Sequence, residues 1–312
     1  MKAVRFAEYG GPDVLRYEDA PRPQAGPGEV LIEVAGTSFN PVDAGIRAGY
    51  LQQVFPVRFP HTPGVDVAGT VAELGEGVSG SAVGDPVVGF LPMDVDGSAA
   101  QFVTAPAAVL TPAPTSIPLA DAATLPAVAL TAWQALFGDA GLRAGQRVLV
   151  NGAGGGVGGF AVQFAHQAGA IVVATASARS TDAVRAAGAD QIVDYTSADL
   201  TTAVDPVDVV LNLVSASEPE ITVLRSFVVP GGILVSTASP ASPDSARSVR
   251  AANVQVRSDA TQLAAIVAKV DAGEVRVDVS STHPLAELSR VHEQSAAGAI
   301  RGKVVLVPEP AR

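Results

Sequence analysis

The 312-residue sequence contains no cysteine. Disulfide bonds, thiolate nucleophiles and metal sites with thiolate ligands are therefore excluded. Aromatic residues make up only 5% of the chain and charged residues only 16%. No uninterrupted apolar run reaches the ~18 residues that a membrane-spanning helix needs. We therefore expect neither a membrane span nor a membrane partner.

Basic residues are also in the minority, with 20 Lys and Arg against 31 Asp and Glu and a formal net charge of -11. This charge repels phosphate backbones, so we expect no nucleic-acid partner. A local basic pocket can still bind a small anionic cofactor. Residues 1–5 lead into an alternating segment rather than the apolar stretch of a signal peptide, so a cytoplasmic location is expected.

Small and apolar residues are abundant, with 48% of the chain apolar and 31 glycines. In the first third, apolar segments such as 30–35 and 65–74 are separated by Gly and Pro, which predicts the short strands of a partly open β-barrel. From residue 146 onward, strand and helix patterns alternate. This alternation predicts a doubly wound parallel sheet covered by helices on both faces, and thus an α/β fold.

Changes in composition place the expected domain boundaries. Residues 112–118 are rich in proline and precede a helical stretch over residues 121–136. We predict a catalytic domain over residues 1–122 and a cofactor domain over residues 123–262. Residues 263–312 read as helix, strand, helix and strand, and are expected to return to the catalytic domain.

A glycine-rich turn follows the first strand of the predicted parallel sheet. Gly152, Gly155 and Gly158 have the spacing Gly-x-x-Gly-x-x-Gly. Gly156 and Val157 are the first residues of the predicted helix. Glycines let backbone N–H groups approach a diphosphate, and the helix N-terminus favours an anion. A flexible turn without a ligand is the alternative, but the position between a strand and a helix favours a dinucleotide site.

The end of the second parallel strand indicates which dinucleotide binds. NAD sites usually carry an acidic residue about 20 residues after the glycine turn, to bind the ribose 2′-hydroxyl. Residues 175–179 contain no acid, but they include Ser177 and Arg179, which can bind a 2′-phosphate. We predict NADPH as the cofactor. The alternative is that both are ordinary surface residues at a helix start.

Several further segments carry a family resemblance over essentially the whole chain. They are Asn-Pro-Val-Asp at 40–43, Pro-Gly-Val-Asp at 63–66, Ala-Leu-Thr-Ala-Trp at 129–133, Gly-Ala-Asp at 188–190 and Gly-Lys-Val-Val-Leu at 302–306. With the glycine turn, they resemble the zinc-independent quinone oxidoreductase (zeta-crystallin-like) branch of the medium-chain dehydrogenase/reductase superfamily. The resemblance implies a GroES-like barrel domain, a Rossmann domain and reduction of quinones, enones or enoyl thioesters.

Departures from the zinc-dependent branch of that superfamily point away from a metal. Those enzymes carry a cysteine near the position of Asn40 and a Gly-His-Glu motif where this chain has Gly-Val-Asp at 64–66. His61 lies nearby, but one histidine without partners makes a poor metal site. We therefore expect no metal and no Lewis acid for alcohol oxidation, and a structural or pocket-lining role for His61.

The resemblance implies two catalytic candidates, Tyr50 and Asn40. Mitochondrial-type enoyl thioester reductases have a tyrosine at a spacing similar to Tyr50, whose phenol would donate to an enolate. Asn40 would lie near the nicotinamide. The alternatives are that Tyr50 only lines the pocket and that Asn40 forms a turn before Pro41. Asp43 would orient this loop or cap a helix.

Further cofactor contacts are implied by the resemblance or by positions at strand ends. They are Thr131, Tyr195, Asn212, Val214, Ser236, Ala238 and Lys303. The alternatives are that Thr131 packs within its helix, that Tyr195 is a surface residue and that Lys303 stands in a hairpin turn.

Two classes of function remain open from the sequence. The first is an enzyme that uses NADPH to reduce a quinone or an activated carbon–carbon double bond of a small-molecule substrate. The second is an NADPH-binding sensor or scaffold with little catalytic activity. The resemblance also implies a homodimer formed edge to edge by the last strands of the parallel sheet, and residues 254–256 offer such an edge.

Overall fold

The computed structural model describes residues 1–310 and divides into two compact units. The first unit contains residues 1–127 and the chain from Ser258 onward, and the second contains residues 128–257. The chain crosses between the units twice, at 127/128 and at 257/258. The sequence-based boundaries, at 122/123 and 262/263, lie near these crossings.

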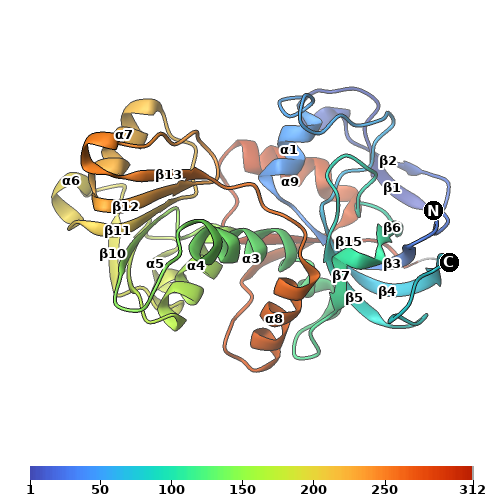
Figure 1. Cartoon of the computed structure of the whole chain (residues 1–312). Coiled ribbons are helices and arrows are strands. Elements are labelled where there is room, and N and C mark those ends of the chain that lie inside the picture. Colours follow the sequence, from blue (N-terminus) through green and yellow to red (C-terminus); the bar gives the residue numbers. More distant parts are fainter. Residues whose placement is uncertain (311–312) are drawn as a thin grey trace. The chain divides into compact units, whose positions relative to one another are not determined.

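A mostly antiparallel sheet in the order β14-β15-β3-β4-β5-β7 forms the centre of the first unit, with β6 paired to β3 (Figure 1). β1 and β2 form a separate pair. The strand bounds are β1 Lys2–Arg5, β2 Arg16–Asp19, β3 Glu29–Ser38, β4 Asp66–Leu74, β5 Pro86–Phe90, β6 Phe102–Pro106, β7 Leu110–Pro112, β14 Val279–Pro284 and β15 Lys303–Val307. β15 pairs antiparallel with β3, so the C-terminal segment belongs to this unit.

Apart from the 12-residue α8, the helices of the first unit are short. Their bounds are η1 Pro12–Val14, α1 Pro41–Arg47, η2 Ala107–Val109, α2 Leu119–Ala122, α8 Ala260–Asp271, η5 Leu285–Glu287 and α9 Leu288–Ala296. The core of the sheet is built from small branched residues such as Val30, Ile32 and Val67, each with no exposed surface. β-branched side chains suit such pleated, buried surfaces.

Six parallel strands in the order β10-β9-β8-β11-β12-β13 form the second unit, with helices on both sides (Figure 1). The strand bounds are β8 Arg147–Asn151, β9 Ile171–Ala176, β10 Gln191–Asp194, β11 Val207–Asn212, β12 Val228–Ser236 and β13 Arg250–Asn253. The helix bounds are α3 Pro126–Trp133, η3 Gln134–Asp139, α4 Gly156–Gln167, α5 Thr181–Ala186, α6 Leu200–Ala203, α7 Glu218–Ser226 and η4 Ser245–Arg247. The strand order reverses at β8, which confirms the predicted doubly wound sheet.

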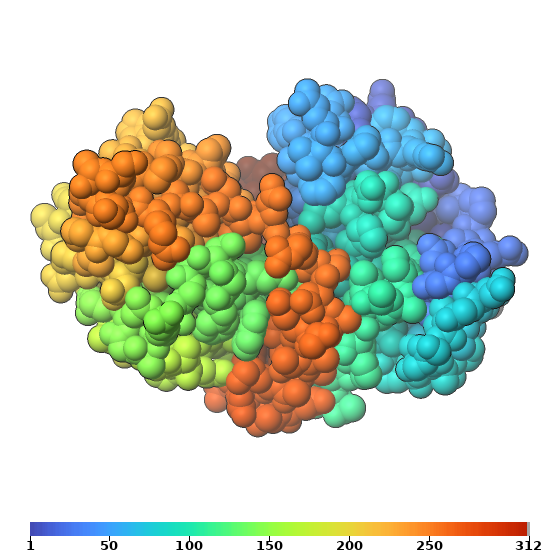
Figure 2. Space-filling view, in the orientation of Figure 1, coloured from blue at the N-terminus to red at the C-terminus, as the bar shows by residue number. Residues whose placement is uncertain are grey.

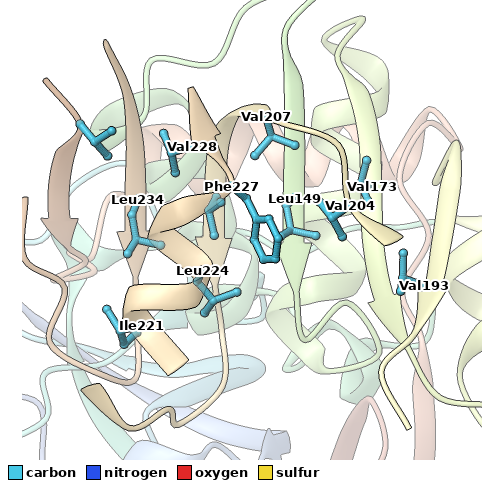
Figure 3. Close-up of a cluster of buried hydrophobic side chains, with 12 residues drawn as sticks. Leu149, Val173, Val193, Val204, Val207, Ile221, Leu224, Phe227, Val228 and Leu234 are labelled. Atoms are coloured by element: carbon cyan, nitrogen blue, oxygen red, sulfur yellow. The ribbon is translucent and has the colours of Figure 1, made fainter. Parts of the chain in front are cut away.

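One face of this parallel sheet buries a continuous apolar cluster (Figure 3). Leu149 of β8, Val173 of β9 and Leu234 of β12 have no exposed surface. Leu224 of α7 and Phe227 pack against them. Because both faces of a parallel sheet are covered, its strands read as nearly continuous apolar runs, and this is why the sequence pattern predicted them.

Two predicted elements were wrong. The helix expected over residues 121–136 is divided into α2, α3 and the π-helical turn η3, because Pro126 lacks an N–H group and begins a new helix instead of continuing one. The last strand of the parallel sheet is β13 rather than residues 254–256. Asn253 pairs with Ser236, the last residue of β12, and the Val254 N–H donates to the Ser236 carbonyl, so within residues 1–310 the ladder ends there.

Within residues 1–310, every helix is too short or too polar to cross a bilayer.

Candidate functional site

The turn between β8 and α4 can be built only from glycine at its key positions. Gly152 has a φ of +94°, and a Cβ there would lie 2.8 Å from Val214 Cγ1. A Cβ on Gly158 would lie 2.4 Å from the Gly152 carbonyl oxygen. The first N–H groups of the 12-residue helix α4 lack intrahelical partners and point toward this turn. The turn therefore offers backbone donors and a positive helix end to an anion.

Polar side chains form a hydrogen-bonded line along the carboxyl edge of the parallel sheet, beginning beside the glycine turn. The Gly152 N–H donates to Thr175 Oγ1, and this hydroxyl donates to Asn151 Oδ1, both at 2.9 Å. Asn151 Nδ2 in turn donates to Asn212 Oδ1 at 2.9 Å. The sequence analysis did not assign Asn151 and Thr175 to the site. The sequence feature that could have revealed these two residues is a polar residue at the end of an apolar strand.

The same line continues toward β12. Asn212 Nδ2 donates to the Val214 carbonyl at 2.9 Å and to Ser236 Oγ at 3.2 Å. Asn212 and Ser236 are buried, whereas Val214 and Ala238 are exposed just beyond their strands. The structure thus brings these four predicted residues to one sheet edge, where doubly wound folds bind ligands.

The loop after β9 packs directly against the glycine turn. A Cβ on Gly154 would lie 2.5 Å from Ser180 Oγ, and that hydroxyl donates to the Ser177 carbonyl at 3.2 Å. Arg179 lies exposed in this loop. Tyr195 follows β10 with 54% of its surface exposed. Ser177, Arg179 and Tyr195 therefore all follow carboxyl ends of strands on one side of the glycine turn.

Two other predicted cofactor residues belong neither to the strands of this sheet edge nor to the loops that follow them. Thr131 is half-buried within α3. Lys303 belongs to the first unit, where it begins β15 and therefore does not stand in a hairpin turn. It is 4% exposed, and its ammonium donates to the Phe39 carbonyl at 3.0 Å, to Asn40 Oδ1 at 2.7 Å and to Asp66 Oδ2 at 3.3 Å. Lys303 is the cation of a buried polar network.

Asn40 is held inside the same network. Its Nδ2 donates to Asp66 Oδ2 at 2.7 Å and to the Ser38 carbonyl at 3.3 Å, while its Oδ1 accepts from Lys303. Only 3% of its surface is exposed. Both amide hydrogens and the amide oxygen are thus engaged within the first unit. The sequence analysis noted Asp66 only as part of a motif, although it is central to this network.

Asp43 is a second buried carboxyl close to Asp66. Its two oxygens accept the N–H groups of Asn40 and Gly64, both at 3.1 Å, and the first of these bonds caps α1. Burial, reinforced by the Asp66 charge, raises the pKa of Asp43 to about 7, against the opposing effect of the two N–H groups and Lys303. Burial also lowers the pKa of Lys303, although Asp66 counteracts this.

Tyr50 lies beyond the other end of α1, and 86% of its surface is exposed. Its phenol therefore points to the outside of the first unit rather than into its core. His61 is buried, with Nδ1 3.5 Å from Asp96 Oδ1 and its ring against Phe6. Within the described part of the chain, no three metal-ligating side chains are grouped as a metal site would require.

Comparisons with known families agree with this architecture. The family described as "Alcohol dehydrogenase GroES-like domain" matches residues 26–115, and the family described as "Zinc-binding dehydrogenase" matches residues 187–306. The chloroplast envelope quinone oxidoreductase homolog of Arabidopsis thaliana is 40% identical over 201 residues. This alignment covers 62% of the chain and 61% of that relative.

Two other relatives match over nearly the full chain. The chloroplastic NADPH-dependent alkenal/one oxidoreductase of Arabidopsis thaliana is 31% identical, over 99% of this chain and 80% of its own length. A solved structure of mycobacterial Rv1454c complexed with NADPH has a TM-score of 0.87 and 30% identity, over 99% of this chain and all of that one. The fold, the glycine turn and these full-length matches together show that the chain belongs to the medium-chain dehydrogenase/reductase superfamily, in its quinone oxidoreductase branch.

Proposed function

We propose that this protein is an NADPH-dependent oxidoreductase that transfers hydride to a quinone or an α,β-unsaturated carbonyl compound without a metal. The observation that carries the proposal is the glycine turn with the acid-free Ser177–Arg179 loop packed against it. Relatives named for NADPH-dependent alkenal/one reduction and for quinone reduction support the same reaction class.

The second unit supplies the groups that would hold the cofactor. Backbone N–H groups at the start of α4 bind the diphosphate, and Ser177 and Arg179 bind the 2′-phosphate. Asn212 and Ser236 keep the sheet edge in one arrangement through their hydrogen bond. The bound cofactor supplies the hydride, and the protein binds and orients it.

The first unit would supply the proton. Tyr50 is the proposed donor, because its exposed phenol can reach a substrate at the surface of this unit. The buried Asn40 acts on the loop that precedes α1 rather than on the substrate, because both amide hydrogens and the amide oxygen already have partners within the first unit. A developing enolate needs only such a donor and an oriented acceptor.

The residues that replace the zinc ligands support metal-independent chemistry. Asn40 stands near the position of the cysteine of zinc-dependent members, and Gly-Val-Asp at 64–66 replaces their Gly-His-Glu motif. Asn40 and Asp66 are both hydrogen-bonded to the Lys303 ammonium. The Lys303 ammonium thus already binds the oxygen atoms of Asn40 and Asp66 that could otherwise bind a metal. His61, the remaining nearby ligand type, interacts with Asp96.

We further propose a homodimer that forms through the edge strand β13. This strand ends the parallel sheet, and Arg250 and Asn253 are exposed. Residues of this region lie at the surface of the second unit in the space-filling view (Figure 2). The expected cytoplasmic location stays a prediction, because the Arabidopsis alkenal/one relative is named as chloroplastic.

Cofactor titration and turnover assays test the proposed function. Calorimetry should give tighter binding for NADPH than for NADH, and absorbance at the NADPH band should fall when quinones or enones are added. Treatment with a chelator should leave that rate unchanged. The absence of NADPH binding at millimolar concentration, or loss of turnover after chelation, would contradict the proposal.

A further inference from the structure

Three polar side chains form a hydrogen-bonded chain on the outermost strand of the sheet in the first unit. The Nε2 atom of His283 lies 3.1 Å from Ser281 Oγ, and its Nδ1 atom lies 3.2 Å from Glu287 Oε2. Ser281 and His283 belong to β14, and Glu287 is the last residue of η5, which follows that strand directly. All three residues therefore lie within the first unit.

The local sequence explains why these side chains meet. Side chains two positions apart on a strand share one face, which brings Ser281 and His283 together. Pro284 is the last residue of β14, because a proline has no N–H group with which to continue the ladder. The 3₁₀ turn that follows carries Glu287 to the histidine ring, and Arg290 Nη1 donates to the same Glu287 oxygen at 3.2 Å. The carboxylate is thus held from two sides.

The partners of His283 determine which ring nitrogen carries the proton. An ionised carboxylate only accepts hydrogen bonds, so Nδ1 donates to Glu287. In the neutral imidazole, Nε2 is then the acceptor and receives the hydroxyl hydrogen of Ser281. Serine hydrolases of several unrelated folds have the same order of nucleophile, base and carboxylate. The Ser281 hydroxyl therefore faces a base that can take its proton.

A backbone N–H group beside Ser281 can stabilise an oxyanion. The Val304 carbonyl accepts the Phe39 N–H on the β3 side of β15, so the next residue, Val305, bonds toward β14. Thr282 is the partner of Val305 in the parallel β14–β15 ladder, and a residue opposite a bonding residue turns its own N–H away. Among the strands of residues 1–310, β14 pairs only with β15. The Thr282 N–H therefore faces the open edge, one position after the serine, where α/β-hydrolases also have an oxyanion donor.

We propose that Ser281 is a nucleophile for acyl transfer from small activated esters. His283 is its general base, Glu287 orients the imidazole, and the Thr282 N–H binds the oxyanion. Ser281 Oγ forms a bond to the acyl carbon while its proton moves to His283 Nε2, and the leaving alcohol or thiol departs with that proton. Water then attacks the acyl-serine with His283 again as base, which releases the carboxylic acid and restores Ser281.

The position of the site favours this class of ester. Ser281 and His283 are half-buried on an edge strand, so a short acyl group reaches the hydroxyl without entering the core. One oxyanion donor contributes about 10²–10³-fold to the rate, so an aryl ester or thioester, with its good leaving group, suits the site better than an alkyl ester. Neither step uses a nicotinamide cofactor, so this activity and the proposed function can be tested separately.

The reaction of the full chain with p-nitrophenyl acetate tests the proposal. Absorbance measures the released p-nitrophenolate, and mass spectrometry of peptides locates the acetyl group. The chain has no cysteine, so the most nucleophilic competing side chain is absent. The acetyl group should map to Ser281 and disappear from this peptide in Ser281→Ala. His283→Gln should slow the acetylation of Ser281 by at least ~10²-fold, and Glu287→Gln should slow it as well.

The neighbouring serine provides the matched control. The Ser280 hydroxyl donates to the Lys303 carbonyl at 2.8 Å, so Ser280→Ala should keep the parental rate. Ser281→Cys should be acetylated faster than the parent, because a thiol is the stronger nucleophile, and addition of His283→Gln should remove that gain. A parent without acetyl-Ser281, or equal acetylation of Ser281 in the parent and in His283→Gln, would overturn the proposal and leave these residues a structural role only.

Discussion

At the scale of single residues, the chemistry of this protein depends on which charges are buried and which are exposed. Lys303 and Asp66 form a buried ion pair at 3.3 Å, whereas Arg179 is exposed beside the glycine turn. A buried charge without its partner is energetically costly, so the Lys303–Asp66 pair serves the stability of the folded structure. An exposed arginine can bind a phosphate through its planar donors.

Arg179→Ala should therefore change cofactor preference. Charge-assisted hydrogen bonds contribute about 1.5–3 kcal/mol, so the Kd for NADPH should rise at least about tenfold. The Kd for NADH should change little, because it lacks the 2′-phosphate. Arg185→Ala is the control, since Arg185 is exposed in α5 and pairs with Asp182. Calorimetric titration of each variant with both cofactors is the measurement, and equal losses for both would contradict the assignment.

Asp43 should make stability depend on pH. Its pKa is raised in the folded protein from 3.8 to about 7, so the stability that it contributes is present at low pH and is lost as pH rises through about 7. Asp43→Asn removes this dependence. The stability advantage of the parent over the variant should shrink between about pH 4 and about pH 7 in urea unfolding. A gap that stays constant would contradict the shifted pKa.

At the scale of elements, close packing between β8 and α4 determines the shape of the glycine turn. Gly158 and Gly159 are neighbours in α4, yet only the first contacts the turn. A Cβ on Gly158 would overlap the Gly152 oxygen and the Ala153 backbone, whereas a Cβ on Gly159 would meet no atom within 4 Å. The two positions therefore form a matched pair for substitution.

Gly158→Ala should destabilise the protein by about 1–3 kcal/mol, the usual cost of overpacking, and weaken NADPH binding. Gly159→Ala should leave binding unchanged and stabilise α4 by up to ~1 kcal/mol, because alanine has the higher helix propensity. Denaturant unfolding and NADPH titration of both variants are the measurements. Similar behaviour of the two variants would show that the turn is not packed as described.

At the scale of the whole molecule, the unpaired edge of the parallel sheet bears on assembly. Among the strands of residues 1–310, β13 pairs only with β12, and an unpaired edge is a ready template for another strand. Two copies joined at β13 would extend the six parallel strands into a continuous sheet. The same edge would stay solvated in a monomer.

Light scattering should therefore give a mass near twice the 31.4 kDa of one chain at micromolar concentration. Hydrogen exchange at the β13 amides should also be slow, because a strand edge inside a dimer interface is protected from solvent. A monomer by scattering, with fast exchange in β13, would refute assembly through this strand.

Local sequence patterns determined much of this protein by themselves. Strand–helix alternation after residue 146 predicted the doubly wound sheet, and the spacing of Gly152, Gly155 and Gly158 predicted its turn. Hydrophobic periodicity and glycine geometry act over a few residues, so they can be read along the chain. The end of the last strand, at Asn253, could not be read from the sequence, because it depends on where β12 ends.

Only the tertiary structure decided which polar residues work together. Asn40 and Asp66 are 26 positions apart and Lys303 and Asp66 are 237 apart, yet their side chains share one buried carboxylate oxygen. It also placed Ala127 and Ser258 at a single pair of strand residues. Such contacts follow from the closure of the sheet by β15 and from strand register, and neither leaves a periodic signal in the sequence.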